Sequence, residues 1–546
     1  MIYNSSVQFI KREFLILILI FAIAAVLRLV GLNWDQGFHL HPDERFLTMV
    51  GVAMKMPSSI IEYLDPAKSP MNPANIGFPF FVYGIFPLTL AKLVALISGL
   101  DTYEGFTLVG RGLSALADLF AVAVLFKVVE YFEKEYDFSP KLKFFTVFFY
   151  AISVLPIQLS HFFAVDTFLN GFLLLSFYSL LRKKAWLSAI FFGLAAASKV
   201  TAVFFLPVLV FLMFKSSRSS KDLLKLLFLF FLVSFLILKI TNPYIFSTGN
   251  IFDPKPHPLF LKNLQDLKIL QNPDIWYPPS VQWINKRPVT FALNNLVTYG
   301  LGIPLGILAV TGAVYLFSRR RYAIPSVLLS WVLVFFLYES SQFTKNMRYF
   351  LILYPYLAFF AAYGLIHLFR NKYTRIIILT LTVIWPMAFF SIYLRPHSRV
   401  EATRWILENI PTESRILVEH WDDALPLPLE DPNKKTYTLT ELPVFDKDSD
   451  EKWERMSRLL KSGDYYVLSS NRAWGSVTTV PEKYPRTSQY YRELLGEKTE
   501  YRLVKKITSY PSLRYLGIPL DFPDQQSDES FTVYDHPVVL IYQRLN

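Results

Sequence analysis

Long apolar runs separated by short basic stretches restrict this chain to one fold class. A helix crosses the roughly 30 Å hydrocarbon core of a bilayer with about 20 apolar residues. Nine runs of about that length precede residue 395, and the sequence is 53% hydrophobic with only 18% charged residues. We therefore predict a polytopic α-helical membrane protein. The runs cover residues 14–32, 107–127, 143–160, 166–182, 223–241, 293–317, 322–338, 349–369 and 374–394.

Basic clusters at the ends of these runs predict the topology, because basic loops stay on the cytoplasmic side. For all the clusters to lie there, run 79–98 cannot cross completely, and we predict a re-entrant or interfacial helix. Run 186–214 must then be a hairpin with its tip near Lys199. This gives about 11 spans, a cytoplasmic N-terminus and an extracytoplasmic C-terminus. The clusters are Lys11-Arg12, 127–143, Arg182-Lys183-Lys184, 215–221, Arg319-Arg320-Arg321 and 370–375.

Helical and strand patterns alternate after residue 394, which predicts a small α/β domain. We therefore divide the chain into a membrane domain, residues 1–394, and an extracytoplasmic α/β domain, residues 395–546. The predicted helices are 401–409 and 451–461, the strands are 415–419 and 465–469, and a closing strand pair is 531–533 with 538–542.

Charge and composition exclude several classes of function. The net charge of +12 comes from the membrane part, because residues 395–546 hold more acidic than basic side chains. The excess is therefore a topology signal and does not indicate nucleic-acid binding. With no cysteine, disulfides and thiolate metal sites are excluded. The sequence has no glycine-rich nucleotide loop, so nothing indicates a soluble nucleotide donor.

Four segments with candidate functional residues fall on the same, outer side of this topology. They contain Asp43-Glu44, His161 with Asp166, Lys199, and the loop 339–348. Ionisable groups in or beside apolar segments are costly unless they have partners, so such residues are functional candidates. Their convergence predicts one site at the outer membrane surface.

The two acidic segments suggest acid–base or metal chemistry. Asp43 is our candidate general base for an acceptor hydroxyl, with Glu44 beside it. Alternatively, Pro42-Asp43-Glu44 is simply a helix start. Asp43 and Asp166 could share a divalent cation, Mg²⁺ or Mn²⁺, although Asp166 would also suit the cap of a helix from Thr167.

The basic candidates suggest a phosphate ligand. They are Arg111, Lys199, Lys345 and Arg348, with Tyr349 adjacent. Arginine binds phosphate through paired hydrogen bonds. Alternatively, Arg111 pairs with Asp118 on its own helix, and Lys345 and Arg348 flank a span. Arg28 lies late in the first run, where it can reach the membrane interface.

Three further features are candidates for ligand binding. His161, His420 and Asp422 could contact a sugar or acceptor. Asp446 to Asp450 resembles the start of a calcium loop but lacks the glycine and the final acid, so we interpret it as a cap for the helix from Glu451. The loop 241–290 is rich in aromatic residues, including Trp276-Tyr277-Pro278-Pro279, which suit an interface or a sugar face.

Taken together, these segments resemble a GT-C glycosyltransferase of the protein O-mannosyltransferase and lipid A aminoarabinose transferase superfamily, glycosyltransferase families 39 and 83. The resemblance covers roughly residues 10–395, and the order and spacing of its pieces make it specific. The pieces are HPDERF, GFPFFVYGIFPLTLAKLVALISGL, VGRGLSAL, SHFFAVDTFLNGFLLLSFYSLLR, GLAAASKVTAVFFLPVLV and KNMRYFLILYPYLAFFAAYGL.

The resemblance implies an inverting transferase in the cell membrane that takes a sugar from a polyprenyl-phosphate donor at the outer face. Asp43 matches the catalytic aspartate, Glu44 its acidic neighbour and Asp166 the second acidic position. The basic positions near the lipid phosphate match Arg111, Lys199 and Arg348. The C-terminal domain matches neither subfamily, so the acceptor, whether protein, lipid or glycan, is not specified. Rival classes are a secondary transporter and a non-catalytic scaffold.

Overall fold

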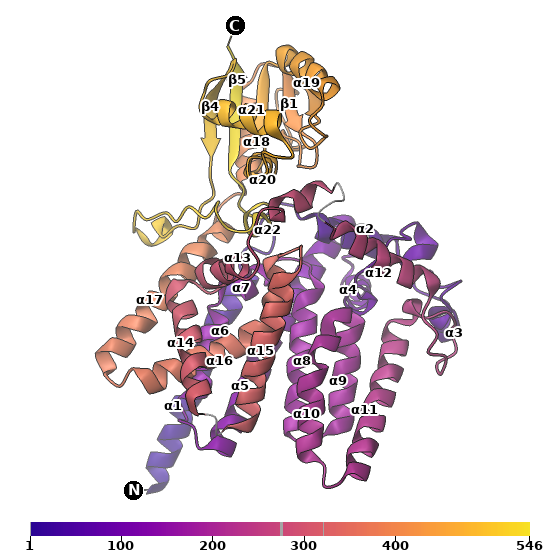
Figure 1. Cartoon of the computed structure of the whole chain (residues 1–546), viewed down its shortest axis with the longest axis vertical. Coiled ribbons are helices and arrows are strands. Elements are labelled where there is room, and N and C mark those ends of the chain that lie inside the picture. Colours follow the sequence, from indigo (N-terminus) through magenta and orange to yellow (C-terminus); the bar gives the residue numbers. More distant parts are fainter. Residues whose placement is uncertain (1, 273–276, 320–321, 546) are drawn as a thin grey trace.

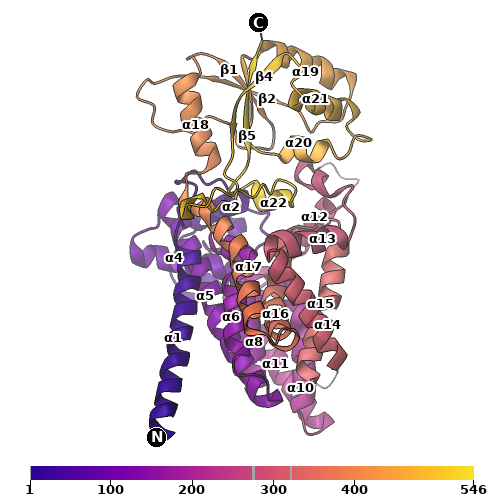
Figure 2. The same cartoon turned by 90° about the vertical axis from the view of Figure 1, so that its left-hand side faces the viewer.

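The computed structural model consists of a helical bundle with a mixed α/β domain at one end (Figures 1 and 2). The structure describes residues 2–272, 277–319 and 322–545, with residues 2–12 described by their backbone only. Trp276, Arg320 and Arg321 lie outside these ranges. The N-terminus and the turn between α10 and α11 lie at the end of the bundle away from the α/β domain (Figure 1). We call the opposite end the domain-facing end.

The bundle confirms a polytopic helical architecture. In the described residues, five helices are long and apolar enough to cross a membrane, or six if the α6–α7 pair, bent by 55°, is one span. Five further apolar helices have 10–17 residues, so the count of about 11 spans stays a prediction. The bundle helices are α1 Ile2–Leu29, α5 Tyr103–Tyr136, α6 Leu142–Ala151, α7 Val154–Ser160, α8 Val165–Leu181, α9 Ala185–Ser198, α10 Leu206–Ser216, α11 Ser220–Thr241, α14 Ile303–Arg319, α15 Ala323–Ser341, α16 Tyr354–Leu368 and α17 Lys372–Phe390.

The segment predicted as a hairpin is broken where we expected it. Helix α9 ends at Ser198, and the 3₁₀ helix η2, Val200–Phe205, leads into α10, which leaves Lys199 at the break. Helix α4, Ile85–Ser98, lies near the domain-facing end (Figure 1). Its 14 residues extend about 21 Å, less than the hydrocarbon core of roughly 30 Å, and the re-entrant or interfacial placement of run 79–98 stays a prediction.

Short helices cover the domain-facing end. The segment 241–290, which we described as a loop, contains α12, a helix not predicted because its amphipathic pattern is short and begins with proline. The helices and turns here are α2 Pro42–Ala53, α3 Ile60–Leu64, η1 Pro73–Ile76, η3 Pro243–Ile245, α12 Pro258–Leu270, η4 Pro278–Trp283, α13 Thr290–Asn295, the π-helix η5 Leu296–Gly300, η6 Met347–Leu353 and η7 Ser391–Leu394.

The α/β domain is built on a five-stranded sheet of order β2-β1-β3-β5-β4. Strand β1 is parallel to β2 and β3, whereas β5 is antiparallel to β3 and β4. Two strands, β2 and β4, were not predicted, because they are edge strands with mostly exposed side chains. The elements are α18 Ser398–Asn409, β1 Arg415–Glu419, β2 Thr438–Leu442, α19 Asp450–Ser462, β3 Tyr465–Leu468, α20 Arg472–Val477, α21 Pro485–Leu495, β4 Tyr501–Ile507, η8 Arg514–Leu516, α22 Glu529–Thr532 and β5 Val539–Arg544.

The predicted strand 531–533 is wrong, because these residues pack on the bundle instead of joining the sheet. Residues 508–538, between β4 and β5, leave the sheet and pack on the bundle, with α22 among them. Gln158 donates to the Phe531 carbonyl (2.7 Å) and to Asp535 (3.0 Å), and Tyr393 donates to Asp535 (2.9 Å). One hydrophobic core cluster contains buried side chains of both the bundle and one part of the sheet. We call residues 508–538 the insert.

Candidate functional site

Asp43 lies in the first turn of a helix at the domain-facing end. His41 caps α2 by accepting from the Glu44 amide (3.3 Å), and Pro42 is its first residue. The segment is thus a helix start, as its alternative interpretation had it. The helix also directs Asp43 to Arg348, with which it forms an ion pair.

The surroundings of Asp43 keep its carboxylate ionised. Burial alone would raise its pKa, but the Arg348 guanidinium, His41 and a hydrogen bond from Tyr83 together lower it to about 2. The carboxylate can therefore accept a proton or hydrogen bond at neutral pH. Tyr83 was not a sequence candidate, because an outer-loop tyrosine carries no distinguishing pattern.

A second ion pair lies beside the first. Lys199, at the break between α9 and η2, binds Asp166 at 2.7 Å. Asp166 is in the first turn of α8 but is not its cap residue, which is Ala164. The Tyr349 ring joins the two pairs, since its centroid is 4.8 Å from Lys199 Nζ and 5.5 Å from Arg348 Cζ. We call Asp43, Arg348, Tyr349, Lys199 and Asp166 the carboxylate–cation cluster.

Lys345 is a buried cation beside this cluster. It precedes η6, the 3₁₀ helix that carries Arg348 and is capped by Asn346. Only 4% of Lys345 is exposed, and its ammonium donates to the Phe343 carbonyl at 3.0 Å. Burial lowers its pKa. Among the described residues no carboxylate pairs with Lys345, so its charge is available to an anion.

Arg111 and Glu44 belong to a separate buried network. Arg111 donates to Asp35 (2.7 and 3.0 Å) and to Glu44 (2.9 Å). The predicted pair of Arg111 with Asp118 is wrong, because Asp118 binds Arg28 at 2.6 Å, and Arg28 is fully buried rather than at the interface. Arg111 and Glu44 bind each other within the fold, so we assign them a structural role.

The other candidate ligand residues have partners within the protein. His161 is fully buried, stacks on Tyr393 at 3.6 Å and has both ring nitrogens beside backbone carbonyls. The side chain of Asp422 is only 3% exposed and binds Arg399 at 2.6 Å. Neither can reach a ligand in this arrangement. His420 is exposed and bonds Glu441 at 2.9 Å, on the α/β domain.

The donor set does not fit a divalent cation. Asp43 and Asp166 are each paired with a different cation, so neither presents a free carboxylate to a shared ion. Across the part of the chain that the structure describes, no three metal-ligating side chains gather. The predicted Asp43–Asp166 metal site is therefore not supported, and we use no metal below.

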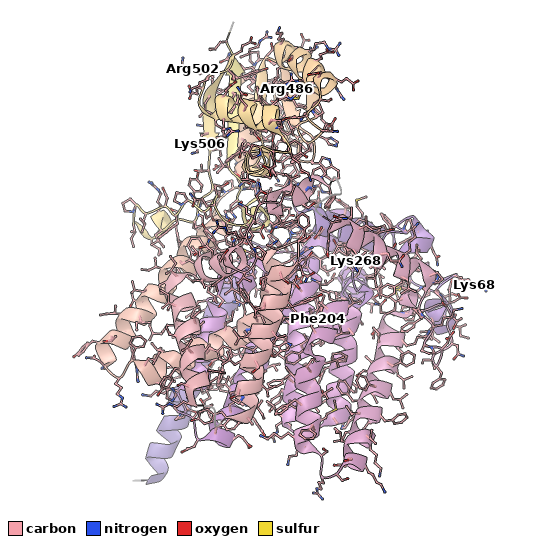
Figure 3. All side chains as sticks on the ribbon, in the orientation of Figure 1. Lys68, Phe204, Lys268, Arg486, Arg502 and Lys506 are labelled. Atoms are coloured by element: carbon pink, nitrogen blue, oxygen red, sulfur yellow. The ribbon has the colours of Figure 1, made fainter. Side chains whose placement is uncertain are left out.

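An apolar groove runs along the bundle from the region of Lys199. It lies between η2–α10 and α15, and Phe204, which is labelled in Figure 3, packs against Phe335 and Tyr338 in its wall. Its lining begins four residues after Lys199, and α15 ends four residues before Lys345. The groove residues are Val203, Phe204, Pro207, Val208, Val327, Ser330, Trp331, Val334, Phe335 and Tyr338.

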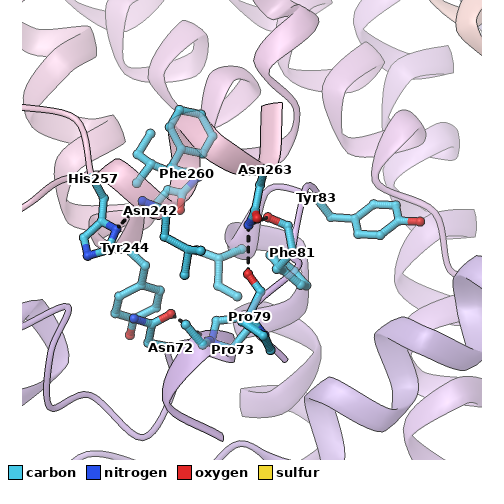
Figure 4. A pocket seen from close by; sticks show the side chains of 14 residues that line it. Asn72, Pro73, Pro79, Phe81, Tyr83, Asn242, Tyr244, His257, Phe260 and Asn263 are labelled. Atoms are coloured by element: carbon cyan, nitrogen blue, oxygen red, sulfur yellow. Dashed lines mark hydrogen bonds between the residues drawn. The ribbon is translucent and has the colours of Figure 1, made fainter. Parts of the chain in front are cut away.

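A small polar cavity lies on the other side of Tyr83. Its wall combines amides, aromatic rings and His257 from the segments 72–85 and 242–263, while the Tyr83 ring points away from it (Figure 4). Because Tyr83 also hydrogen-bonds Asp43, one side chain separates the cavity from that carboxylate. The lining includes Asn72, Phe81, Tyr83, Asn242, Tyr244, His257, Phe260 and Asn263.

Comparisons with known proteins identify the fold. The chain is similar to the archaeal oligosaccharyltransferase AglB from Archaeoglobus fulgidus, solved in complex with an inhibitory peptide and a dolichol-phosphate. The TM-score is 0.52 at 13% identity, over 97% of this chain and 88% of that chain. The apo form of the Archaeoglobus fulgidus enzyme gives a TM-score of 0.51 at 14% identity over the same shares. The chain has the GT-C fold.

Within the GT-C fold, the identities are too low to show more than architecture. ArnT from Cupriavidus metallidurans, in the apo state, aligns over 98% of both chains at 12% identity, with a TM-score of 0.45. No protein-family model matches the sequence, and no curated protein matches it significantly. The resemblance predicted from the sequence is confirmed at the level of the fold.

Proposed function

We propose that this GT-C protein is a membrane glycosyltransferase that moves a sugar from a polyprenyl-phosphate donor to an acceptor at the outer face of the membrane. One observation carries the proposal: a carboxylate–cation cluster lies beside an apolar groove. A polyprenyl-phosphate sugar has the complementary chemistry, with an anionic phosphate between a sugar and a long hydrocarbon chain. We also propose that the domain-facing end and residues 395–546 face the outside of the cell.

The donor phosphate binds the cations of the cluster. Lys199 Nζ and Arg348 Cζ lie 4.8 and 5.5 Å from the Tyr349 ring centroid, and Lys345 adds a charge that has no carboxylate partner among the described residues. The isoprenoid chain lies in the groove between α10 and α15, whose wall is almost entirely apolar. Charge-assisted hydrogen bonds to phosphate are about twice as strong as neutral ones. Burial strengthens them further, which favours the cluster over exposed lysines as the phosphate site.

Asp43 acts on the acceptor. The acceptor nucleophile attacks the anomeric carbon opposite the phosphate, the bond from that carbon to the phosphate oxygen breaks, and its electron pair leaves with polyprenyl phosphate. Asp43 takes the proton of the nucleophile. A single displacement inverts the configuration of the anomeric carbon. Lys199 and Arg348 stabilise the charge that develops on the departing phosphate.

Donor binding also raises the basicity of Asp43. In the structure Arg348 holds the pKa of Asp43 near 2, which makes Asp43 a weak base. A phosphate that shares the Arg348 guanidinium weakens this ion pair, and the pKa of the buried carboxylate then rises. The proposed order is therefore donor first, then proton transfer from the acceptor.

Turnover of defined donors tests the proposed function. Purified protein is incubated with a panel of polyprenyl-phosphate sugars, and released polyprenyl phosphate and glycosylated acceptor are quantified. We expect one donor to release lipid phosphate with sugar covalently bound to the acceptor. The rival transporter class predicts movement of the lipid-linked sugar across vesicle membranes with no covalent product, and that result would contradict the proposal.

The pH profile of an Arg348→Gln variant tests the pairing with Asp43. The pKa of Asp43 is about 2, below its ordinary value of 3.8. The ion pair with Arg348 therefore stabilises the fold above pH 4, and this stabilisation is lost as the pH falls through 2. Without Arg348, burial is no longer offset and this pKa rises. We expect the acid limb of kcat/KM to move to higher pH than in the wild type. An unmoved acid limb would show that Arg348 does not control Asp43.

Cysteine labelling tests the orientation in a chain that has no native cysteine. Ser58, Ser216 and Ser457 are exposed and lie in the first outer loop, at the end of α10 and in α19. We expect a membrane-impermeant maleimide to label cysteines at positions 58 and 457 in intact cells. Position 216 should label only after permeabilisation. The reverse pattern would place the cluster at the cytoplasmic face.

A further inference from the structure

We propose that the α/β domain is a positioning part of the active site, because its residues hold the segments that carry Asp43 and Arg348 at a fixed separation. This inference rests on the proposed function and deepens it. Asp43 belongs to α2 and Arg348 to η6, which are 305 residues apart in the chain. Each of these segments is bound directly by residues of the α/β domain.

The first contact fixes α2 from the side. Arg45, two residues after Asp43, donates to Asp423 at 2.8 Å. Asp423 in turn accepts from Arg399 at 2.8 Å, and Arg399 is almost fully buried at the start of α18. The position of α2 is therefore tied to the α/β domain through two consecutive ion pairs.

The second contact holds the N-terminus of α2. The ring of Tyr534, which belongs to the insert, packs on His41, the cap residue of α2, with centroids 4.2 Å apart. Tyr534 is followed by Asp535 and His536, and the His536 ring binds Asp535 and, at 2.8 Å, Asp524. Asp535 also binds Gln158 and Tyr393 of the bundle, so Tyr534 is held in a rigid setting.

The third contact fixes the segment that carries Arg348. The amide of Met347, immediately before Arg348, donates to Asp528 at 3.1 Å. The Asp528 amide donates to Asn295 of the bundle at 2.7 Å. Asp528 also caps α22. The insert therefore bridges η6 and the bundle at the residue next to the catalytic cation.

These contacts surround both members of one ion pair, and this explains why they matter for turnover. A misplacement of about 1 Å in catalytic groups can lower a rate roughly 10²-fold. Releasing α2 or η6 changes the Asp43–Arg348 separation but leaves Lys199 and the apolar groove in place. Loss of a contact should therefore lower kcat more than it raises the KM for the donor.

An Arg45→Ala variant tests the inference. Arg45 is 39% exposed in its side chain, so its removal should be tolerated by the fold. The matched control is Arg486→Ala, which breaks the Arg486–Asp450 pair of 2.8 Å in the α/β domain, away from the bundle (Figure 3). We expect kcat to fall at least tenfold in Arg45→Ala, with donor KM changed less than threefold and Tm equal to that of the control. Arg45→Lys should recover part of kcat.

Hydrogen exchange gives a readout that does not depend on turnover. We expect amides of residues 42–53 to exchange faster in Arg45→Ala than in Arg486→Ala. In Asp528→Asn, the faster exchange should appear in residues 347–353. Unchanged exchange in both segments would overturn the inference whatever the activity. If the wild type releases no lipid phosphate while exchange changes as expected, the proposed function fails and the positioning contacts stand.

Discussion

An Asp43→Asn protein should lose sugar transfer by a factor of about 10²–10⁴, the usual contribution of a general base. Asparagine keeps the size of the side chain and a hydrogen-bond acceptor for Arg348 but cannot take the acceptor proton. The measurement is initial release of polyprenyl phosphate at saturating donor and acceptor. Donor binding should persist, because Lys199, Lys345 and the apolar groove are unchanged.

The control for this variant is Asp65→Asn. Asp65 directly follows α3 and is partly exposed; its carboxylate accepts from the Ala67 amide (2.9 Å) and forms a weak ion pair of 4.0 Å with Lys68. We expect wild-type turnover in Asp65→Asn and an equal yield of folded protein for both variants. Near wild-type kcat in Asp43→Asn would remove Asp43 from the proton transfer.

The second large effect concerns the donor phosphate. Lys199→Ala and Arg348→Ala should each raise the KM for the lipid donor by about 10–100-fold, since a hydrogen bond to a charged group contributes about 1.5–3 kcal/mol. The KM for the acceptor should change less than twofold. Lys345→Ala should act in the same direction. The kinetics are measured with donor and acceptor varied separately.

Lys68→Ala is the matched control for these lysine and arginine variants. Lys68 lies at the edge of the domain-facing end and its side chain is 79% exposed (Figure 3). It should leave both KM values unchanged. If Lys199→Ala and Arg348→Ala raised donor and acceptor KM equally, the cluster would not be a specific phosphate site.

The sequence predicted the members of the cluster but not how they are paired. Counting crossings from the basic clusters brought Asp43, Asp166, Lys199 and Arg348 to one side, and the structure brings these four together. The Tyr349 ring between the two pairs could not be foreseen, because ring placement depends on how η6 packs.

Arg111 shows why pairing escaped prediction. On its own helix the acids Glu104 and Asp118 each lie seven residues away, but its partners are Asp35 and Glu44, which lie 76 and 67 residues away in the chain. Asp118 instead forms an ion pair with Arg28, 90 residues away in the chain. Buried ions pair where helices cross, and crossing angles and depths are not encoded in local spacing.

Only part of the α/β domain was predicted from the sequence. Strands β1 and β3 are buried apolar runs, which the sequence pattern revealed, whereas β4 alternates weakly and carries several charges. The insert was not predicted, because its apolar residues pack against the bundle rather than the sheet.

The position of β5 in the sheet has a consequence for biosynthesis. This strand is the last of the five in chain order, yet it lies between β3 and β4 in the interior of the sheet. The sheet can therefore close only after β5 has been synthesised and has left the ribosome. A chain that lacks β5 would lack the complete sheet of the domain that, in our proposal, holds α2 and η6 in place.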